Sequence, residues 1–203
     1  MKKYELTEET TNIFGKTLHR IRATRDFSNV HAGDLGGFIE NELNLSHDRD
    51  TWVYGNAWVY GNAWVYGEAR VYGNAWVYGE ARVGGNALVS GDARVGGKAL
   101  VGGDAWVGGK ALVSGNALVY GNALVKGPRD IYWISCIGSR DGTTTFFRNA
   151  NNSISVSCGC FYGTIDEFAA AVTKTHGDNE HAQAYRHAIE IAKLRIKLTD
   201  AES

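Results

Sequence analysis

The chain has 203 residues, 44% of them hydrophobic, with a formal net charge of -1. This composition is typical of a globular protein and excludes a disordered chain. The near-zero charge also argues against a dedicated nucleic-acid binder, which would carry a basic excess.

The N-terminal sequence MKKYELTEETTN has two lysines but no apolar segment after them, so no signal peptide is expected. No apolar run is long enough for a transmembrane helix. The cysteines are few and odd in number, at positions 136, 158 and 160, which is typical of free thiols in a reducing compartment. Together these features predict a cytoplasmic protein that makes no use of a membrane.

Residues 1–50 are predicted to form an N-terminal cap segment. The stretch from Ile13 to Ala23 alternates like a single strand. The stretch from Gly33 to Ile39 has the glycines of a turn that leads into a first, imperfect coil. A solenoid needs an end cap of this kind, because its terminal coil otherwise leaves its core and its main-chain polar groups uncovered.

Residues 51–128 divide into thirteen six-residue repeats without insertion or deletion, and Pro128 closes the last one. The first position is Thr51 once and alanine afterwards. The third is valine in all thirteen, from Val53 to Val125, and the fifth is glycine in all thirteen. Alanine and valine two residues apart lie on one side of a short strand, and glycine suits the corner that follows. Such strict self-similarity predicts a solenoid whose stacked coils share a core of valine and alanine.

The pattern Ala-x-Val-x-Gly-x resembles the hexapeptide-repeat family, over all 78 residues of the repeat. The resemblance implies a left-handed parallel β-helix with three hexads per coil, and therefore about four and a third coils for thirteen hexads. It also implies a homotrimer that packs along the prism. The predicted fold is therefore mainly β, with a small α+β domain after the helix.

With valine inside, the second and fourth positions of each hexad face outward. Neighbours on one face are three hexads apart, which places Trp52 next to Arg70, Trp58 next to Trp76, and Trp64 next to Arg82. The aromatic side chains could form a stabilising ladder, form an interface, or be covered by the terminal segments. Stacking of a base or sugar on them ranks lower, because the sequence shows no converging polar or basic cluster. The predicted binding or interface residues in the repeat are Trp52, Trp58, Trp64, Trp76, Tyr54, Tyr60, Tyr66, Tyr72 and Tyr78.

Residues 129–203 are predicted to form the C-terminal domain. Strands are expected at residues 131–137, 143–148 and 153–158. Thr164 and Glu167 form a capping box that opens a helix, which the stretch from His176 to Asn179 ends. In a second helix, a seam suits packing either on the sheet or on symmetry mates, and its members Tyr185, Ile189 and Ile196 are candidate interface residues.

The repeat lacks the features of catalysis. Hexapeptide-repeat acyltransferases place a catalytic histidine in the coils and interrupt them with a loop, whereas this chain has no histidine from Asp48 to Thr175 and no interruption. A zinc site at Cys158, Cys160, His176 and His181 is a weak candidate, because the two cysteines are separated by one residue only. Neither a catalytic residue nor a cofactor is predicted.

The flanks resemble hexapeptide-repeat proteins of tailed phages and prophages. The segments that carry this likeness are residues 20–23, 33–38, 159–164 and 175–178. The resemblance implies a phage-encoded accessory protein in the host cytoplasm. The preferred hypothesis is a non-catalytic binder of a host protein or small-molecule signal that blocks a host defence component. The alternatives are a structural or trimerisation module of a virion part, and an acyltransferase.

Overall fold

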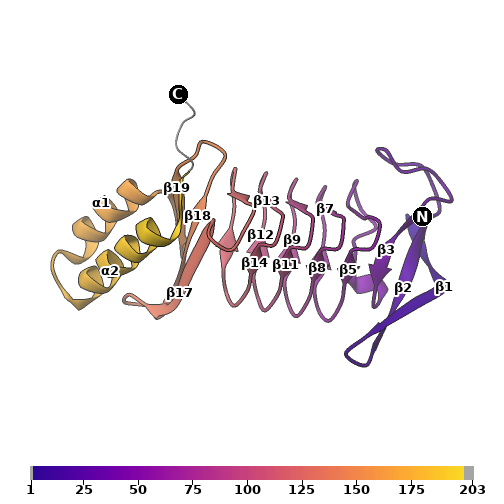
Figure 1. Cartoon of the computed structure of the whole chain (residues 1–203), viewed down its shortest axis with the longest axis horizontal. Helices are drawn as coiled ribbons and strands as arrows, with labels where there is room; N and C mark the ends of the chain where they lie inside the picture. Colours follow the sequence, from indigo (N-terminus) through magenta and orange to yellow (C-terminus); the bar gives the residue numbers. More distant parts are fainter. Residues whose placement is uncertain (1, 199–203) are drawn as a thin grey trace.

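The computed structural model describes residues 2–198. The molecule is elongated, with a β-hairpin at the N-terminal end, a solenoid in the middle and two helices at the other end (Figure 1). The first elements are β1 (Tyr4–Ile13), β2 (Lys16–Ala23), β3 (Leu35–Ile39) and the 3-10 helix η1 (Glu42–Asn44). The predicted single strand from Ile13 to Ala23 is wrong at its start, because Phe14 and Gly15 both have positive φ and turn the chain between β1 and β2.

Thirteen two-residue strands follow, one from each hexad. They are β4 (Trp52–Val53), β5 (Trp58–Val59), β6 (Trp64–Val65), β7 (Arg70–Val71), β8 (Trp76–Val77), β9 (Arg82–Val83), β10 (Leu88–Val89), β11 (Arg94–Val95), β12 (Leu100–Val101), β13 (Trp106–Val107), β14 (Leu112–Val113), β15 (Leu118–Val119) and β16 (Leu124–Val125).

With β3, these strands form three sets of parallel strands around one core, in the orders β3-β5-β8-β11-β14, β4-β7-β10-β13-β16 and β6-β9-β12-β15. The first set continues beyond β3 into β2 and β1, which pair antiparallel. Hydrogen-bonded neighbours are 18 residues apart, as the three-hexad coil requires. Before the regular repeat, β3, Leu45 (bridged to Val65) and β4 make one further, irregular coil. The solenoid therefore has five coils, rather than the four and a third that the hexads alone predicted.

The prediction that alanine and valine face inward is confirmed. Every repeat valine from Val53 to Val125, and every repeat alanine, is at most 2% exposed. The corner glycines from Gly55 to Gly121 have φ between 57° and 75°. A Cβ at Gly91 would lie 3.0 Å from the main chain of Gly109 in the next coil, so both the corner conformation and the coil spacing require glycine there.

The N-terminal end of the solenoid is closed by polar side chains. Main-chain N–H groups of one coil donate to carbonyls of the next, as Trp58 does to Ala75. The carbonyls of the first coil therefore receive no hydrogen bond from a preceding coil and need other donors. Lys3 Nζ donates to the carbonyl of Thr51 at 2.7 Å, and the Tyr4 hydroxyl donates to that of Leu45 at 2.8 Å. In the irregular part of the first coil, Asn44 Nδ2 takes the place of a main-chain donor and donates to the carbonyls of Gly61 and Ala63 in the next coil.

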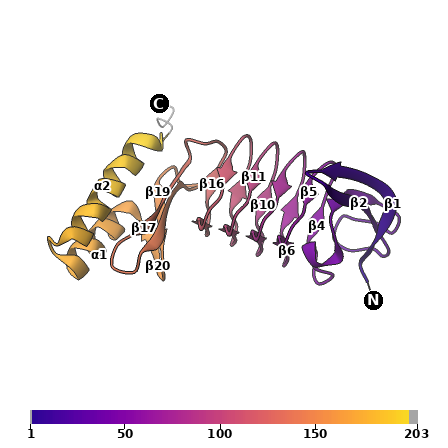
Figure 2. The same ribbon diagram turned by 90° about the horizontal axis from the view of Figure 1, so that it is seen from below.

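The C-terminal region is a four-stranded antiparallel sheet of β17 (Ile131–Ile137), β18 (Gly142–Arg148), β19 (Ile154–Cys158) and β20 (Phe161–Thr164). Two helices, α1 (Ile165–His176) and α2 (Glu180–Arg195), cover its outer face (Figure 2). Successive β18 residues point to opposite faces: Phe146 packs in the helical core and Phe147 in the solenoid core. The Thr164–Glu167 capping box is confirmed. The strand β20 was not predicted, because it has only four residues and contains a glycine.

Candidate functional site

The outward residues of the repeat form columns, and their predicted alignment is confirmed by the strand register. Trp52 pairs with Arg70, Trp64 with Arg82, and Trp76 with Arg94. A leucine follows each arginine one coil further on. Each of the three sheets therefore carries a Trp–Arg–Leu column, and the columns are related by shifts of 12 residues: Trp52–Arg70–Leu88, Trp64–Arg82–Leu100 and Trp76–Arg94–Leu112.

Trp52 is not available for binding, which corrects its assignment to an exposed interface. Its side chain is 1% exposed. The rings of Tyr4 and Phe27 lie against it, with centroids at 6.1 Å and 5.3 Å. The alternative that a terminal segment covers the aromatic residues is thus correct on this face, where β1 and the loop after β2 bury the indole.

The N-terminal hairpin of β1 and β2 partly covers the aromatic residues of the hexad from Ala57 to Asn62. Tyr60 is 7% exposed and packs with Ile13, Leu18 and Phe38, so its assignment as an exposed interface residue is also wrong. Burial raises the pKa of the Tyr60 hydroxyl. Trp58 is half-buried and stacks on Trp76 with centroids 5.0 Å apart and planes 15° from parallel. This contact is the ladder that the sequence suggested.

Trp64 remains open to solvent, at 40% exposure, and its indole stacks on Tyr66 with centroids 4.3 Å apart. Tyr54, Tyr72 and Tyr78 are half-buried. The Tyr54 hydroxyl donates to Asn29 Oδ1 at 3.0 Å, and Tyr78 stacks on Tyr60 with centroids 5.6 Å apart. The solenoid's aromatic side chains therefore line its faces without forming one continuous exposed surface.

The three candidate interface residues of α2 are core residues. Tyr185, Ile189 and Ile196 are buried against the C-terminal sheet and α1. Of the two alternatives for this seam, packing on the sheet is therefore correct, and packing on symmetry mates is not. Burial, and next the hydrogen bond with the Cys158 thiol, raise the pKa of Tyr185 to about 12. The outer side of α2 leaves Leu194 71% exposed.

The four zinc candidates do not form a ligand set. Cys158 Sγ lies 3.1 Å from Thr144 Oγ1, which donates to it, and Cys160 is exposed at the turn into β20. The rings of His176 and His181 lie 5.7 Å apart. Within residues 2–198, no three histidine, cysteine, aspartate or glutamate side chains converge as a metal site would require.

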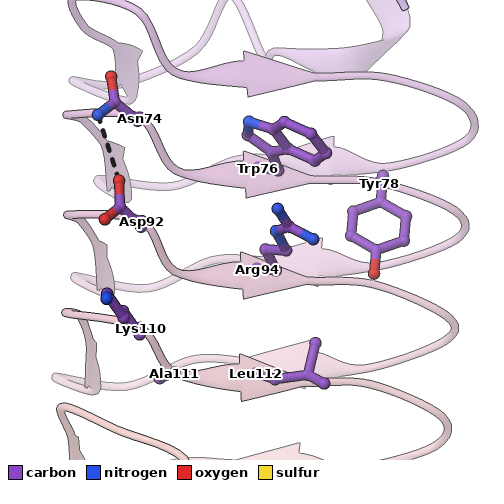
Figure 3. A pocket seen from close by; sticks show the side chains of 8 residues that line it. All are labelled: Asn74, Trp76, Tyr78, Asp92, Arg94, Lys110, Ala111 and Leu112. Atoms are coloured by element: carbon purple, nitrogen blue, oxygen red, sulfur yellow. Dashed lines mark hydrogen bonds between the residues drawn. The ribbon is translucent and has the colours of Figure 1, made fainter. Parts of the chain in front are cut away.

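A groove of about 660 Å³ lies on the sheet that contains β8, β11 and β14. The Arg94 guanidinium lies 4.4 Å from the centroid of the Trp76 ring, in a cation–π contact. Leu112 forms the next step, and Lys110 lies at the groove's edge (Figure 3). At the same edge Asn74 Nδ2 donates to Asp92 Oδ1 at 3.2 Å. We call this set of residues the Arg94 groove.

The Arg94 groove differs from the equivalent positions on the other two sheets, because its two cations have no carboxylate or hydroxyl hydrogen-bonding partner among the described residues. Among residues 2–198, neither Arg94 nor Lys110 makes an ion pair. On the sheet with β9, Lys98 lies 3.8 Å from Glu80, and the Trp64 indole lies on Tyr66 rather than under Arg82. On the sheet with β7, Arg70 donates to Ser28, and Asn86 replaces the lysine.

Sequence reasoning found Trp76 and Tyr78 but missed Asn74, Asp92, Arg94 and Lys110 as a set. These residues come from three consecutive coils and are as far as 36 residues apart, from Asn74 to Lys110. A signal was present in the 18-residue spacing of Asn74 and Asp92, which places both on one corner of the solenoid.

A family model described as the YdcK beta solenoid repeat matches residues 53–67, 81–97 and 111–127. No curated protein matches the chain. The matched segments lie within the five-coil region and support its assignment to the repeat-based β-solenoids. Neither α1 nor α2, nor any other helix in residues 2–198, has the length and apolar character needed to span a bilayer.

Proposed function

We propose that the protein is a rigid, non-catalytic binding protein and that the Arg94 groove is its contact site. The observation that carries the proposal is the Arg94 guanidinium, which lies 4.4 Å from the centroid of the Trp76 ring, lines the same groove as Lys110 and has no carboxylate partner in the described chain. A charged group fixed in this way has little side-chain entropy left to lose on binding. The ladder of main-chain hydrogen bonds beneath it, such as Arg94 to Ala111 at 2.9 Å, keeps the groove preorganised.

The scaffold supports binding rather than acyl transfer. The coils run from Thr51 to Pro128 with no histidine and no inserted loop, so the histidine that a hexapeptide-repeat acyltransferase uses as a base has no counterpart there. The groove offers cations, one carboxylate, an amide and aromatic rings. Such groups recognise a ligand by charge and shape.

In biological terms, we propose a phage-encoded accessory factor of the hexapeptide-repeat type, wound left-handed and assembled as a trimer. It would act in the host cytoplasm and sequester a component of a host defence system. This part of the proposal rests on the resemblance of the repeat and of the flanks, and the Arg94 groove supplies a contact with which such a factor would hold its target.

The proposal is tested by quantitative capture from host lysate, with mass spectrometry of bound proteins and small molecules. The wild type is compared with Arg94→Ala/Lys110→Ala and with the matched pair Arg82→Ala/Lys98→Ala, which has the same 16-residue spacing on another sheet. We expect the first variant to lose a specific captured species and the second to retain it. Equal capture by all three chains refutes the groove as the contact site.

Two further measurements address the alternatives. Abundance of the chain in purified virions, at a fixed ratio to a capsid protein, would favour a structural module. Turnover of acetyl-CoA with any acceptor would favour an acyltransferase, and Arg94→Ala/Lys110→Ala would then show whether the groove takes part.

A further inference from the structure

We infer that the Arg94 groove binds a nucleotide, with the base stacked on the free face of the Arg94 guanidinium and the phosphate at Lys110. This inference rests on the proposed function and adds the chemical class of the ligand.

The first argument is the column of flat groups that leads to Arg94. Arg20 lies 4.4 Å from the Phe38 ring centroid, Phe38 pairs with Trp58 in the strand register, and Trp58 stacks on Trp76. Arg94 then covers the other face of Trp76. Because strands in a sheet are about 4.8 Å apart, each flat group occupies one coil of the stack.

The column of flat groups ends at Arg94, although the sheet continues for one more coil. The next step is Leu112, whose aliphatic side chain is too small to cover Arg94 as a ring would, and which is 43% exposed. The side of the guanidinium away from Trp76 therefore borders the open part of the groove above Leu112 (Figure 3). A guanidinium plane stacks well on aromatic bases. A base placed there would continue the column by one step and cover Leu112.

The second argument is the polar edge of the same space. Asn74, Asp92 and Lys110 follow one another down one corner, beside the column of Trp76, Arg94 and Leu112 (Figure 3). Lys110 supplies a cation for a phosphate. Asp92 Oδ1 is oriented by Asn74, and its carboxylate can accept hydrogen bonds from a ribose hydroxyl or a base amino group. The two cations and one carboxylate leave the groove with one net positive charge.

The size and charge of the groove favour a small ligand over a polyanion. A volume of about 660 Å³ lies within the range of small-molecule sites. The whole chain has a net charge of -1, so no extended basic surface attracts nucleic acid from a distance. A mononucleotide matches one planar slot with one adjacent cation, whereas a simple anion would leave the Arg94 face uncovered.

Isothermal titration of the full chain with AMP, GMP, CMP and UMP tests the inference, with the corresponding nucleosides and inorganic phosphate as the two halves of each ligand. We expect at least one nucleotide to bind, and its nucleoside and phosphate each to bind at least tenfold more weakly. Arg94→Lys keeps the charge but loses the plane, and should weaken binding at least tenfold. Lys110→Ala should weaken the nucleotide but leave the nucleoside unchanged.

The matched variant Arg82→Ala/Lys98→Ala should bind within twofold of the wild type. Thermal unfolding of every variant, within a few degrees of the wild type, confirms that each is folded. If no nucleotide binds the wild type, or if Arg82→Ala/Lys98→Ala loses binding equally, the inference is overturned. If lysate capture still depends on Arg94 and Lys110 while no nucleotide binds, the ligand class is wrong and the proposed function stands. If neither depends on them, both fail.

Discussion

The ring of Tyr66 lies across Gly84, the residue at the equivalent corner of the next coil. A Cβ at Gly84 would collide with the ring edge and with the hydroxyl of this tyrosine. Tyr78 covers Gly96 in the same way, and Tyr120 covers Gly102 from the coil that follows it, whereas Gly108 lies under Trp106 of its own hexad. Every glycine at the fourth hexad position therefore lies beneath an aromatic ring, and for Gly84, Gly96 and Gly102 that ring comes from the neighbouring coil.

Gly84→Ala should destabilise the chain by about 1–3 kcal/mol, because the added methyl group displaces the Tyr66 ring. Backbone strain does not contribute, since Gly84 lacks the positive φ of the corner glycines. Urea unfolding measures the change. Ser114→Ala, at the same hexad position, is the matched control and should change stability by less than about 0.5 kcal/mol.

A double-mutant cycle isolates the contact. Tyr66→Ala combined with Gly84→Ala should cost less than the sum of the single changes, because the methyl group no longer meets a ring. Strict additivity of the two substitutions would show that the ring does not rest on Gly84.

Val77→Asp should unfold the middle coils. The Val77 side chain is fully buried between alanine and valine neighbours, and no polar group in this core can pair with a carboxylate. We expect a loss of at least ~3 kcal/mol, observed as a fall in the thermal midpoint. Leu112→Asp, on the outside of the same sheet, should leave the midpoint nearly unchanged. A wild-type midpoint for Val77→Asp would contradict the inward orientation of the third position.

The regular part of the fold was predictable because one physical rule repeats. Valine at position three fixes the inward face in thirteen hexads, and glycine at position five fixes the corner in twelve of them, so inward residues such as Val77 and columns such as Trp76–Arg94 followed from spacing alone. The irregular first coil was predicted only at residues 33–39, and its continuation through Leu45 was not, because β3 and Leu45 join it without the hexad pattern, through pairings with residues later in the chain such as Phe38 with Trp58.

The burial of Trp52 and Tyr60 was not predictable either, because the residues that cover them lie outside the repeat. Periodicity places Trp52 and Tyr60 outside the tube, and they do lie outside it. The residues that cover them, Tyr4, Phe27 and Leu18, belong to the irregular N-terminal segment. The same limit applied to the Arg94 groove, since whether a lysine pairs with a neighbouring acid, as Lys98 does with Glu80, depends on side-chain conformation rather than on spacing.

Asn44→Ala should destabilise the first coil. The Asn44 amide group donates to the carbonyls of Gly61 at 3.0 Å and Ala63 at 2.8 Å, and the residue is fully buried. Its loss leaves a buried carbonyl without a donor, at a cost of about 1–3 kcal/mol. Hydrogen exchange should show faster opening near residues 61–63, with little change in α1 and α2. Unchanged protection at those residues would contradict the capping role.

The lowered pKa of Lys3 predicts that its contribution to the free energy of unfolding increases with pH, whereas that of most paired lysines decreases. Burial, and next the nearby charge of Arg25, lower the pKa of Lys3 from 10.5 to about 8 in the folded chain, while Asp50 and Asp48 partly oppose the shift. Between pH 8 and 10.5 the folded chain has lost this proton and the unfolded chain still holds it. The unfolded state then binds more protons, so the contribution of Lys3 to stability rises with pH across this window.

The comparison is the free energy of unfolding of wild type against Lys3→Met, measured by urea titration at several pH values from 7 to 10.5. The difference should move in favour of the wild type by up to ~3 kcal/mol as pH rises, and most of the change should fall above pH 8. Tyr4, whose pKa is raised mainly by burial, is present in both chains, so its own titration cancels in the difference. Parallel stability curves for the two chains would mean that the Lys3 ammonium is not buried against the Thr51 carbonyl, and that the first coil is closed in some other way.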